Sequence, residues 1–514
     1  MSSLLKSTSV VGGMTLLSRV LGFVRDVMLA RAFGAGGGMD AFLVALMIPN
    51  FGRRVFAEGA FSQAFVPVFM QAKVLQSHEQ ARELVAVTMG TLGGVLALVT
   101  LAGCLAAPLL VMVFASGFTA NPDQSALAAE LLRWTFPYLM FISMTAMAGA
   151  VLNAYQRFAV PAVTPVILNI CLIASAYVDA SSVRVLAYAV FAAGLLQFAF
   201  QLPSLARLRL LPAPRFAWRD ARVQKILSLM LPVMVGSGTA QLSLLINSNL
   251  ATHLGDGAVS WLYFADRLME FPLGIFSIAL ATVILPALSA QHVQNSPKEF
   301  SATLDWGLRL LCLIGIPAAL ALILLAGPLV ATLFGYGRFD AHDIQMTRFA
   351  LWGYGAGFMG FSLVKLLVPG FYARQEMRLP VRFGVIALLA GMVLSLLLFA
   401  WARSSGFAAG HVGLAIATSF TAWLNAGLLG WRLRKDGVYL AGNGWPVFLL
   451  RLLLANAAMG LLLVWLAGPM SAWIDAGLFD RAQRLAVVIA AGLLVYFAVL
   501  GLSGLRPRHL RRAV

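Results

Sequence analysis

The chain has 514 residues, of which 61% are hydrophobic and 11% are charged, and its formal net charge is +17. A soluble globular chain has about 25% charged residues, so this composition excludes a soluble enzyme and indicates an all-α polytopic membrane protein. Membrane topology and anionic lipid headgroups account for the positive charge, and nucleic acid is therefore not an expected partner.

Apolar runs along the chain predict about fourteen spanning helices, at roughly 20 apolar residues for each span. Their expected centres lie near residues 22, 48, 100, 143, 170, 195, 238, 274, 317, 357, 390, 420, 456 and 493. The second and eighth helices are long. We expect them to break at Pro49–Gly52 and Pro272–Gly274, because proline removes a backbone donor.

Basic residues are unevenly divided between alternate loops. One set of loops carries most of them, among them Lys73, Arg157, Arg207, Arg209, Arg215, Arg219, Arg374, Arg432 and Arg508. The alternate loops hold few, namely Arg184, Arg338, Arg348, Arg403, Arg481 and Arg484. Because cytoplasmic loops are the positive ones, both termini are expected in the cytoplasm.

Several arginines stand inside the first two spanning segments, namely Arg19, Arg25, Arg31, Arg53 and Arg54. A charge at mid-membrane costs roughly 2.5–3.5 kcal/mol even on lenient insertion scales, so such residues usually face a water-filled cavity. Several cations around one cavity call for an anionic ligand, and the guanidinium fork suits phosphate oxygens. The sequence therefore predicts a phosphorylated, lipidic substrate.

Carboxylates accompany these arginines. The first two segments hold Asp26, Asp40 and Glu58, and the eighth holds Asp266, Arg267 and Glu270. Three pairs are close enough in sequence for internal salt bridges, namely Arg25–Asp26, Arg54–Glu58 and Arg267–Glu270. That alternative stays open beside ligand binding for each of them.

An internal repeat is visible when the chain is shifted by 219–220 residues. Phe65–Phe69 then falls on Ile284–Leu288, Ala107–Phe114 on Gly327–Phe334, and Tyr155 near Tyr372. An offset of six helices restores the orientation, so the repeat is parallel, about an axis along the membrane normal. We expect an N-lobe at 1–210, a C-lobe at 211–436, and a two-helix appendage at 437–514.

The chain carries no recognisable catalytic signature. Cys104, Cys171 and Cys312 lie in apolar runs, and the six histidines show no metal-ligand spacing. No Walker A sequence or nucleophile elbow is present. We therefore expect no enzyme activity, no metal and no cofactor, and ATP-driven transport by this chain alone is disfavoured.

Long polar motifs connect the chain to a known family. They occupy residues 15–26, 40–42, 49–50, 53–67, 265–272 and 369–375. At these residues the sequence resembles the MurJ (MviN) family, the lipid II flippases of bacterial peptidoglycan synthesis. The resemblance covers essentially the whole chain and implies a MOP-superfamily fold, with a central cationic cavity and a groove for the polyprenyl tail along the last two helices.

The resemblance also implies roles for single residues. Those matching the family's cavity arginines are Arg19, Arg25, Arg53 and Arg267, of which the last three resemble the set proposed to hold the pyrophosphate. The residues expected to be polar cavity or gating positions are Asp26, Asp40, Arg54, Glu58, Asp266 and Glu270. Met47 stands where some members have a lysine. No sodium site matches, which leaves the driving force open among the membrane potential, Na⁺ and H⁺.

The function implied is the transfer of lipid II from the cytoplasmic to the periplasmic leaflet of the bacterial inner membrane, by alternating access. The expected partners are lipid II and membrane lipids, with cell-wall synthesis or division proteins as further candidates. An O-antigen-type flippase or a drug/cation antiporter of the same superfamily is the alternative. A membrane glycosyltransferase or phosphatase is disfavoured, because the external loops lack clustered carboxylates and histidines.

Overall fold

The computed structural model describes residues 2–55, 61–75 and 77–505, and no strand occurs within them. The first elements are α1 (Ser2–Phe33), α2 (Gly37–Val55), α3 (Ser62–Leu75), α4 (His78–Leu105), α5 (Ala107–Phe114), the 3₁₀ helix η2 (Ser116–Ala120), α6 (Pro122–Thr135), α7 (Pro137–Ala154), α8 (Ala159–Val178) and α9 (Arg184–Arg207). They are followed by α10 (Ala221–Ala251), α11 (Ala258–Val293), α12 (Pro297–Leu324), α13 (Ala326–Leu333), α14 (Ala341–Tyr372), α15 (Arg378–Ser405), α16 (His411–Lys435), α17 (Trp445–Ala467), α18 (Ser471–Ile474) and α19 (Leu478–Leu502).

The expected polytopic membrane fold is confirmed. In the described part of the chain, 10 segments are long and apolar enough to cross a membrane: α4, α6 with α7, α8, α9, α12, α14, α15, α16, α17 and α19. Four more long helices, α1, α2, α10 and α11, bring the total within these residues to the fourteen that hydropathy predicts. Three of the four, α1, α2 and α11, contain the arginines singled out in the sequence.

The two predicted helix breaks are wrong. α2 continues through Pro49 to Val55, and α11 runs for 36 residues with Pro272 and Pro286 inside it. A proline costs one backbone hydrogen bond, but membrane helices tolerate this because neighbouring groups satisfy the freed carbonyl. Pro49 and Pro272 therefore lie within their helices and do not end them, and α2 continues six residues past Pro49.

The internal repeat is visible in the helix bounds. α4 and α12 begin 219 residues apart, and so do α5 and α13, and α6 and α14. α4 and α12 each have 28 residues, and α5 and α13 each have 8. These two pairs of helices therefore repeat in length as well as in order.

Helix ends repeat as well. Asn121 caps α6 by accepting from the backbone N–H of Gln124 at 3.4 Å, and Asp340, 219 residues on, caps α14 in the same way. Gln156 and Gln375, also 219 residues apart, both have φ of 60° just beyond α7 and α14. This fixes the register of the repeat more closely than the two tyrosines do.

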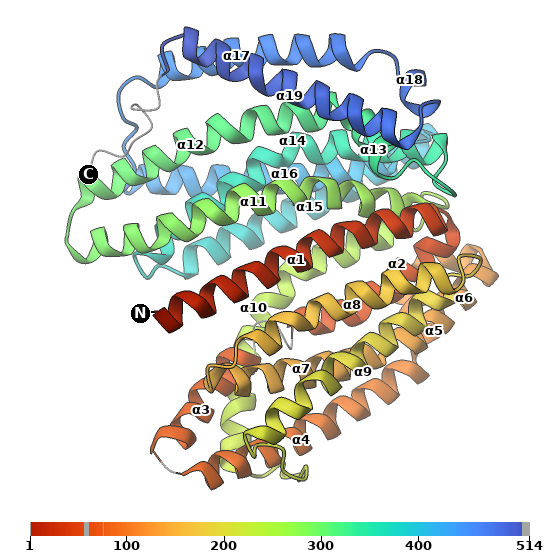
Figure 1. Ribbon diagram of the computed structural model, residues 1–514, viewed down its shortest axis with the longest axis vertical. Helices are drawn as coiled ribbons and strands as arrows, with labels where there is room; N and C mark the ends of the chain where they lie inside the picture. The colour runs from red at the N-terminus through yellow and green to blue at the C-terminus, as the bar shows by residue number, and fades with distance from the viewer. Residues whose placement is uncertain (1, 56–60, 76, 506–514) are drawn as a thin grey trace. The chain divides into compact units, whose positions relative to one another are not determined.

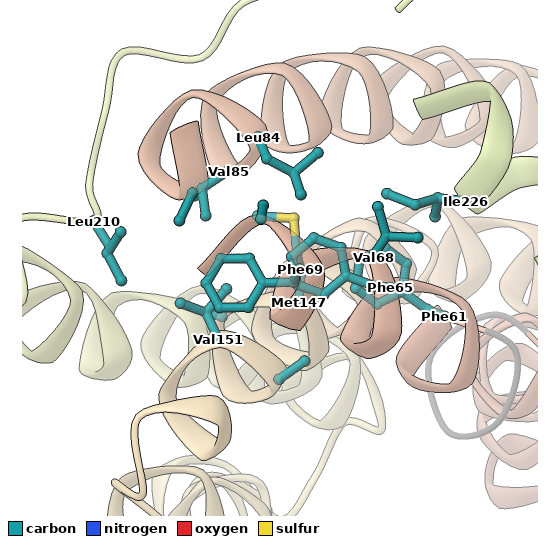
Figure 2. Close-up of a cluster of buried hydrophobic side chains, with 14 of the residues drawn as sticks. Phe61, Phe65, Val68, Phe69, Leu84, Val85, Met147, Val151, Leu210 and Ile226 are labelled. Atoms are coloured by element: carbon teal, nitrogen blue, oxygen red, sulfur yellow. The ribbon is translucent and has the colours of Figure 1, made fainter. Parts of the chain in front are cut away.

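The chain divides into two compact units, Met1–Ser260 and Trp261–Val514. In the first unit, Phe61, Phe65 and Phe69 stack along one face at centroid distances of 5.0 and 5.3 Å, because residues four apart share a helix face. Figure 2 shows them packed beside Met147 and Val151 of α7. In the same unit α1 packs along α8 (Figure 1).

The second unit has an equivalent core. Ile284 and Leu288, the repeat partners of Phe65 and Phe69, are fully buried there against Leu304 and Leu366. These compact units follow packing and not the repeat, since α10 packs against α2 and α3 within the first unit. The limits of the predicted lobes, at residues 210 and 436, stay a prediction.

Buried side-chain hydrogen bonds at three places connect the C-terminal helix pair, α17 and α19, with the rest of the second unit. α17 and α19 lie side by side (Figure 1) and close enough that a Cβ on Gly492 of α19 would come within 2.7 Å of Leu463 of α17. In the last third of α19, the Tyr496 hydroxyl donates to the carbonyl of Leu313 in α12 at 2.6 Å. The appendage is thus built into the unit through buried polar contacts.

At one end of the pair, buried Asp305 of α12 accepts hydrogen bonds from the Tyr439 hydroxyl at 2.9 Å and the Trp445 indole at 2.6 Å. At the other end, the buried Arg481 guanidinium donates to the carbonyls of Ala331 and Gly335 at 2.8 and 2.7 Å. These carbonyls belong to the end of α13, where a cation is favoured by the helix dipole.

Candidate functional site

Arg25 is the most firmly held of the candidate arginines in α1. Its Nη2 and Nε donate to Asp26 Oδ1 at 2.7 and 2.9 Å, and its Nη1 donates to Asn169 Oδ1 at 2.9 Å. The Asn169 amide in turn donates to the carbonyl of Ser18 at 3.0 Å. The side chains of Arg25 and Asp26 are 15% and 3% exposed, so the ion pair that the sequence left open is formed here.

The other two arginines of α1 differ from Arg25. Arg19 and Arg31 are each six residues away from it, which turns their side chains by about 120° on a helix. Both are exposed, whereas Arg25 is partly buried. The structure therefore separates one enclosed guanidinium from two that extend outward.

The arginines of α2 lie in its last turn. Arg53 donates from Nε to Asn50 Oδ1 at 3.1 Å, and both Arg53 and Arg54 are partly buried. Cations are favoured at a helix C-terminus, since its unpaired carbonyls carry partial negative charge. Glu58, expected as the ion-pair partner of Arg54, lies outside the described residues.

Asp40, expected as a polar cavity or gating residue, is buried against the start of α11. It is 1% exposed, and its carboxylate accepts hydrogen bonds from the backbone N–H groups of Gly257 and Ser260 at 2.7 and 2.8 Å. The Ser260 hydroxyl also donates to it, at 2.5 Å. These groups belong to the first turn of α11, so in this structure Asp40 caps a helix and both of its oxygens are engaged.

The second unit holds the remaining candidates on α11. Arg267 Nη1 donates to Glu270 Oε2 at 2.7 Å, and the guanidinium carbon lies 4.9 Å from the ring centre of Tyr263. The two side chains of the ion pair are 30% and 48% exposed, and Asp266 is partly buried. This pair is therefore more accessible than Arg25–Asp26.

The chemistry available to these groups is anion binding. No group of three or more histidine, cysteine or acidic side chains in the described residues is arranged to hold a metal. Guanidinium groups that are only partly exposed and matched by carboxylates can exchange those carboxylates for phosphate oxygens, which offer the same paired acceptors.

Two contributors could not be found from the sequence, whereas Asn50 lies in the motif at residues 49–50. Asn169 is a lone amide in an apolar helix, and Tyr263 is one of the chain's 10 tyrosines. For Asn169, the only signal is that a polar side chain inside a spanning helix needs a partner there. Its partner is 144 residues away, so the contact itself has no local sequence pattern.

Comparison with known proteins adds independent information. The family described as "Lipid II flippase MurJ" matches residues 29–481 of the chain. A Vibrio cholerae serotype O1 protein named "Probable lipid II flippase MurJ" is 43% identical over 521 residues, which are 99% of this chain and 98% of that protein. A Burkholderia cenocepacia protein named "Lipid II flippase MurJ" is 41% identical over 520 residues, 99% of each.

Solved structures share the fold. The structure titled "Lipid II flippase MurJ, inward closed conformation" matches with a TM-score of 0.79 and 23% identity, covering 95% of this chain and 97% of that one. An inward-facing multidrug resistance MATE family transporter of the MOP superfamily matches with a TM-score of 0.62 and 15% identity, covering 82% and 95%. At 23% and 15% identity, these two structural matches show that the fold is shared, but they do not identify the ligand.

Proposed function

We propose, because the chain belongs to the MurJ family of lipid II flippases, that it moves lipid II from the cytoplasmic to the periplasmic leaflet by alternating access. The observation that carries this proposal is 43% identity to a family member across 99% of the chain. The polar head, a pyrophosphate-linked disaccharide-pentapeptide, cannot cross hydrocarbon unaided, so a cationic path through the protein is needed. The step is transport, and no covalent chemistry is required.

The pyrophosphate is held by Arg25, Arg53 and Arg267, with Arg19 at the flank. The Arg25–Asp26 and Arg267–Glu270 ion pairs support an exchange mechanism. In one state the carboxylates neutralise the guanidinium groups, and in the other the pyrophosphate takes their place. This competition prevents binding so tight that the headgroup is never released. Asp40 takes no part in the exchange, since its oxygens cap α11.

The polyprenyl tail stays in lipid beside α17 and α19. Large apolar side chains of this pair are exposed, among them Leu453, Leu461, Trp465, Leu494 and Phe497. Such a face suits a long isoprenoid, because neither partner needs hydrogen bonds. The headgroup and the tail would then follow separate paths during transport.

Orientation and energy supply complete the proposal. Both termini lie in the cytoplasm of a bacterial cell with the protein in its inner membrane, as the loop charges require. A membrane potential negative inside favours outward movement of an anion, by about 2.3 kcal/mol per charge per 100 mV. Na⁺ or H⁺ coupling is the alternative driving force. Cysteine-accessibility labelling that placed residue 215 in the periplasm would overturn the orientation.

The test is transport by arginine variants in cells that depend on this chain as their flippase. Arg25→Ala, Arg53→Ala and Arg267→Ala should each abolish lipid II transfer at normal membrane levels, and Arg31→Ala should have a milder effect. Lysine at the same positions should rescue only in part, because an ammonium cannot form the paired contacts. Normal transfer by all three alanine variants would refute the site.

The lipid that co-purifies in mild detergent separates this function from its closest alternative. An O-antigen-type flippase of the same superfamily would also use a cationic cavity. Recovery of lipid II supports the proposal, and recovery of a different lipid-linked oligosaccharide in its place contradicts it.

A further inference from the structure

The linker between α9 and α10 is an extended segment laid on α4, and we refer to residues 210–219 as the strap. The strap contains no helix, but two of its backbone N–H groups donate to α4. The N–H of Arg215 donates to the carbonyl of Ala86 at 3.0 Å, and the N–H of Ala217 donates to the Thr91 hydroxyl at 3.0 Å. Non-helical backbone near lipid needs such partners, so the strap is fixed in place.

The surface of α4 is shaped to receive the strap. A Cβ on Gly90 would lie 2.3 Å from the carbonyl oxygen of Arg215, and one on Gly94 would lie 3.2 Å from the Phe216 ring. The first distance is impossible without moving backbone, so only glycine at residue 90 permits this approach. The second glycine gives room for the aromatic ring. Together they make a docking groove for the strap.

The strap contacts α4 between Ala86 and Gly94, just beyond the point where this helix changes from charged to apolar. The first two turns of α4 contain Glu79, Arg82 and Glu83, and Ala86 follows at the start of the apolar part. That change marks the boundary between headgroups and hydrocarbon. Phe216 and Trp218 are 68% and 46% exposed at this level, where aromatic side chains are favoured.

The exposed, unpaired charges of the strap region are all positive. The nearby carboxylates are already used, since Arg222 binds Asp220 at 2.7 Å and Glu83 at 3.4 Å. The hydrogen bond from Arg222 also lowers the pKa of Asp220. The exposed arginines of the strap and its approach are Arg207, Arg209, Arg215 and Arg219. Their guanidinium groups make no hydrogen bond or ion pair within the described part of the chain.

We propose that the strap binds anionic phospholipids of the cytoplasmic leaflet. The guanidinium groups of Arg215 and Arg219 hold the phosphate, while Phe216 and Trp218 between them enter the boundary of the acyl chains. Within residues 215–219, two arginines flank two exposed aromatic side chains. This arrangement fits a membrane surface, where phosphates and hydrocarbon lie side by side. An acidic protein is disfavoured because the rings lie beside the apolar part of a spanning helix, where lipid is the immediate neighbour.

The test uses the full chain in mild detergent, with phosphatidylglycerol and phosphatidylcholine of equal acyl length as probes and native mass spectrometry as the readout. Wild type should retain phosphatidylglycerol in preference. The variant carrying Arg215→Gln and Arg219→Gln should lose affinity for it about 20- to 30-fold, at roughly fivefold per arginine, with phosphatidylcholine unchanged. A control carrying Arg338→Gln and Arg403→Gln, from the loops on the other side, should match wild type.

A second pair of variants keeps every charge. Gly90→Ala should displace the strap and lower the affinity for phosphatidylglycerol. Gly93→Ala on the same helix should not, because its Cβ would meet only Met144 at 3.7 Å. If Gly90→Ala does not fold, the variant with Arg215→Gln and Arg219→Gln is sufficient to test the proposal. Equal retention by wild type and that variant, a matching loss of phosphatidylcholine, or displacement of the lipid by free glycerol phosphate overturns the proposal. None of these readouts depends on lipid II transport.

Discussion

The Asp40 carboxylate and Ser260, 220 residues apart, are joined by two hydrogen bonds, one from the backbone N–H at 2.8 Å and one from the hydroxyl at 2.5 Å. An anion placed there satisfies donors at the start of α11 that have no partner within the helix. α11 is also the helix that carries Arg267. The effect of Asp40 on function is therefore expected to act through the position of α11 and not through contact with a ligand.

Removing the Asp40 cap should destabilise the protein. Asp40→Ala leaves buried N–H groups unpaired, which costs about 1–3 kcal/mol for each group, so the thermal unfolding midpoint in detergent should fall clearly. Asp40→Asn keeps one acceptor oxygen, so its unfolding midpoint should fall less. Asp123→Ala is the matched control, an exposed aspartate in the first turn of α6. Equal midpoints for the alanine variants at residues 40 and 123 would contradict the capping role.

Asn169 should matter for transport although it is not expected to touch the ligand. Asn169→Leu keeps the size but removes both of its hydrogen bonds, to Arg25 and to the carbonyl of Ser18. We expect a loss of about 1 kcal/mol in stability. Lipid II transfer should fall by less than in Arg25→Ala, since the guanidinium remains but is less well oriented. Transfer at the wild-type rate would show that Arg25 does not need this support.

Tyr439 should make alkaline stability depend on pH. Burial, followed by the hydrogen bond to Asp305, raises its pKa from 10.0 to about 12. A raised pKa in the folded state means that this contribution is complete below pH 10 and is lost as pH rises through 12. Tyr439→Phe should be less stable than wild type at neutral pH, and the difference should shrink between pH 10 and 12. Tyr177→Phe, at a side chain 77% exposed, is the control. A difference that stays constant over this range would contradict the assignment.

Truncation near residue 440 should separate the two parts of the substrate. Loss of α17 and α19 should weaken binding of long-tailed analogues more than short-tailed ones, which use less of the apolar face. It also removes Trp445, Arg481 and Tyr496, so the shortened chain should unfold at a lower temperature while still folding. Binding of both analogues to intact and truncated protein is the measurement. Equal losses for both tail lengths would make the pair a scaffold only.

Much of the fold follows from sequence patterns that act over short distances. Hydropathy identifies the helices because each must hide its backbone from lipid, and the 219-residue repeat follows from matched core positions such as Phe65 and Ile284. The helix breaks were predicted wrongly at Pro49 and Pro272, since a proline shows which hydrogen bond is missing but not whether a neighbouring group compensates for it. That depends on tertiary contacts.

The candidate arginines could be found because a charge in an apolar run is conspicuous. Their partners were found only where they are close in sequence, as in Arg25–Asp26 and Arg267–Glu270. The contact of Asp40 with Ser260 joins distant parts of the chain, so no spacing rule indicates it. For the same reason Asn169 was missed.

The glutamines at residues 156 and 375 bear on the ancestry of the chain. Each adopts the left-handed conformation. The backbone N–H of the following residue donates to a helix carbonyl, from Arg157 to Leu152 at 2.9 Å and from Glu376 to Phe371 at 3.0 Å. Glycine would relieve a cost of roughly 1–2 kcal/mol at either place. Both halves keep glutamine nevertheless, which points to one duplicated segment whose two copies have diverged in charge while retaining the same strained corner.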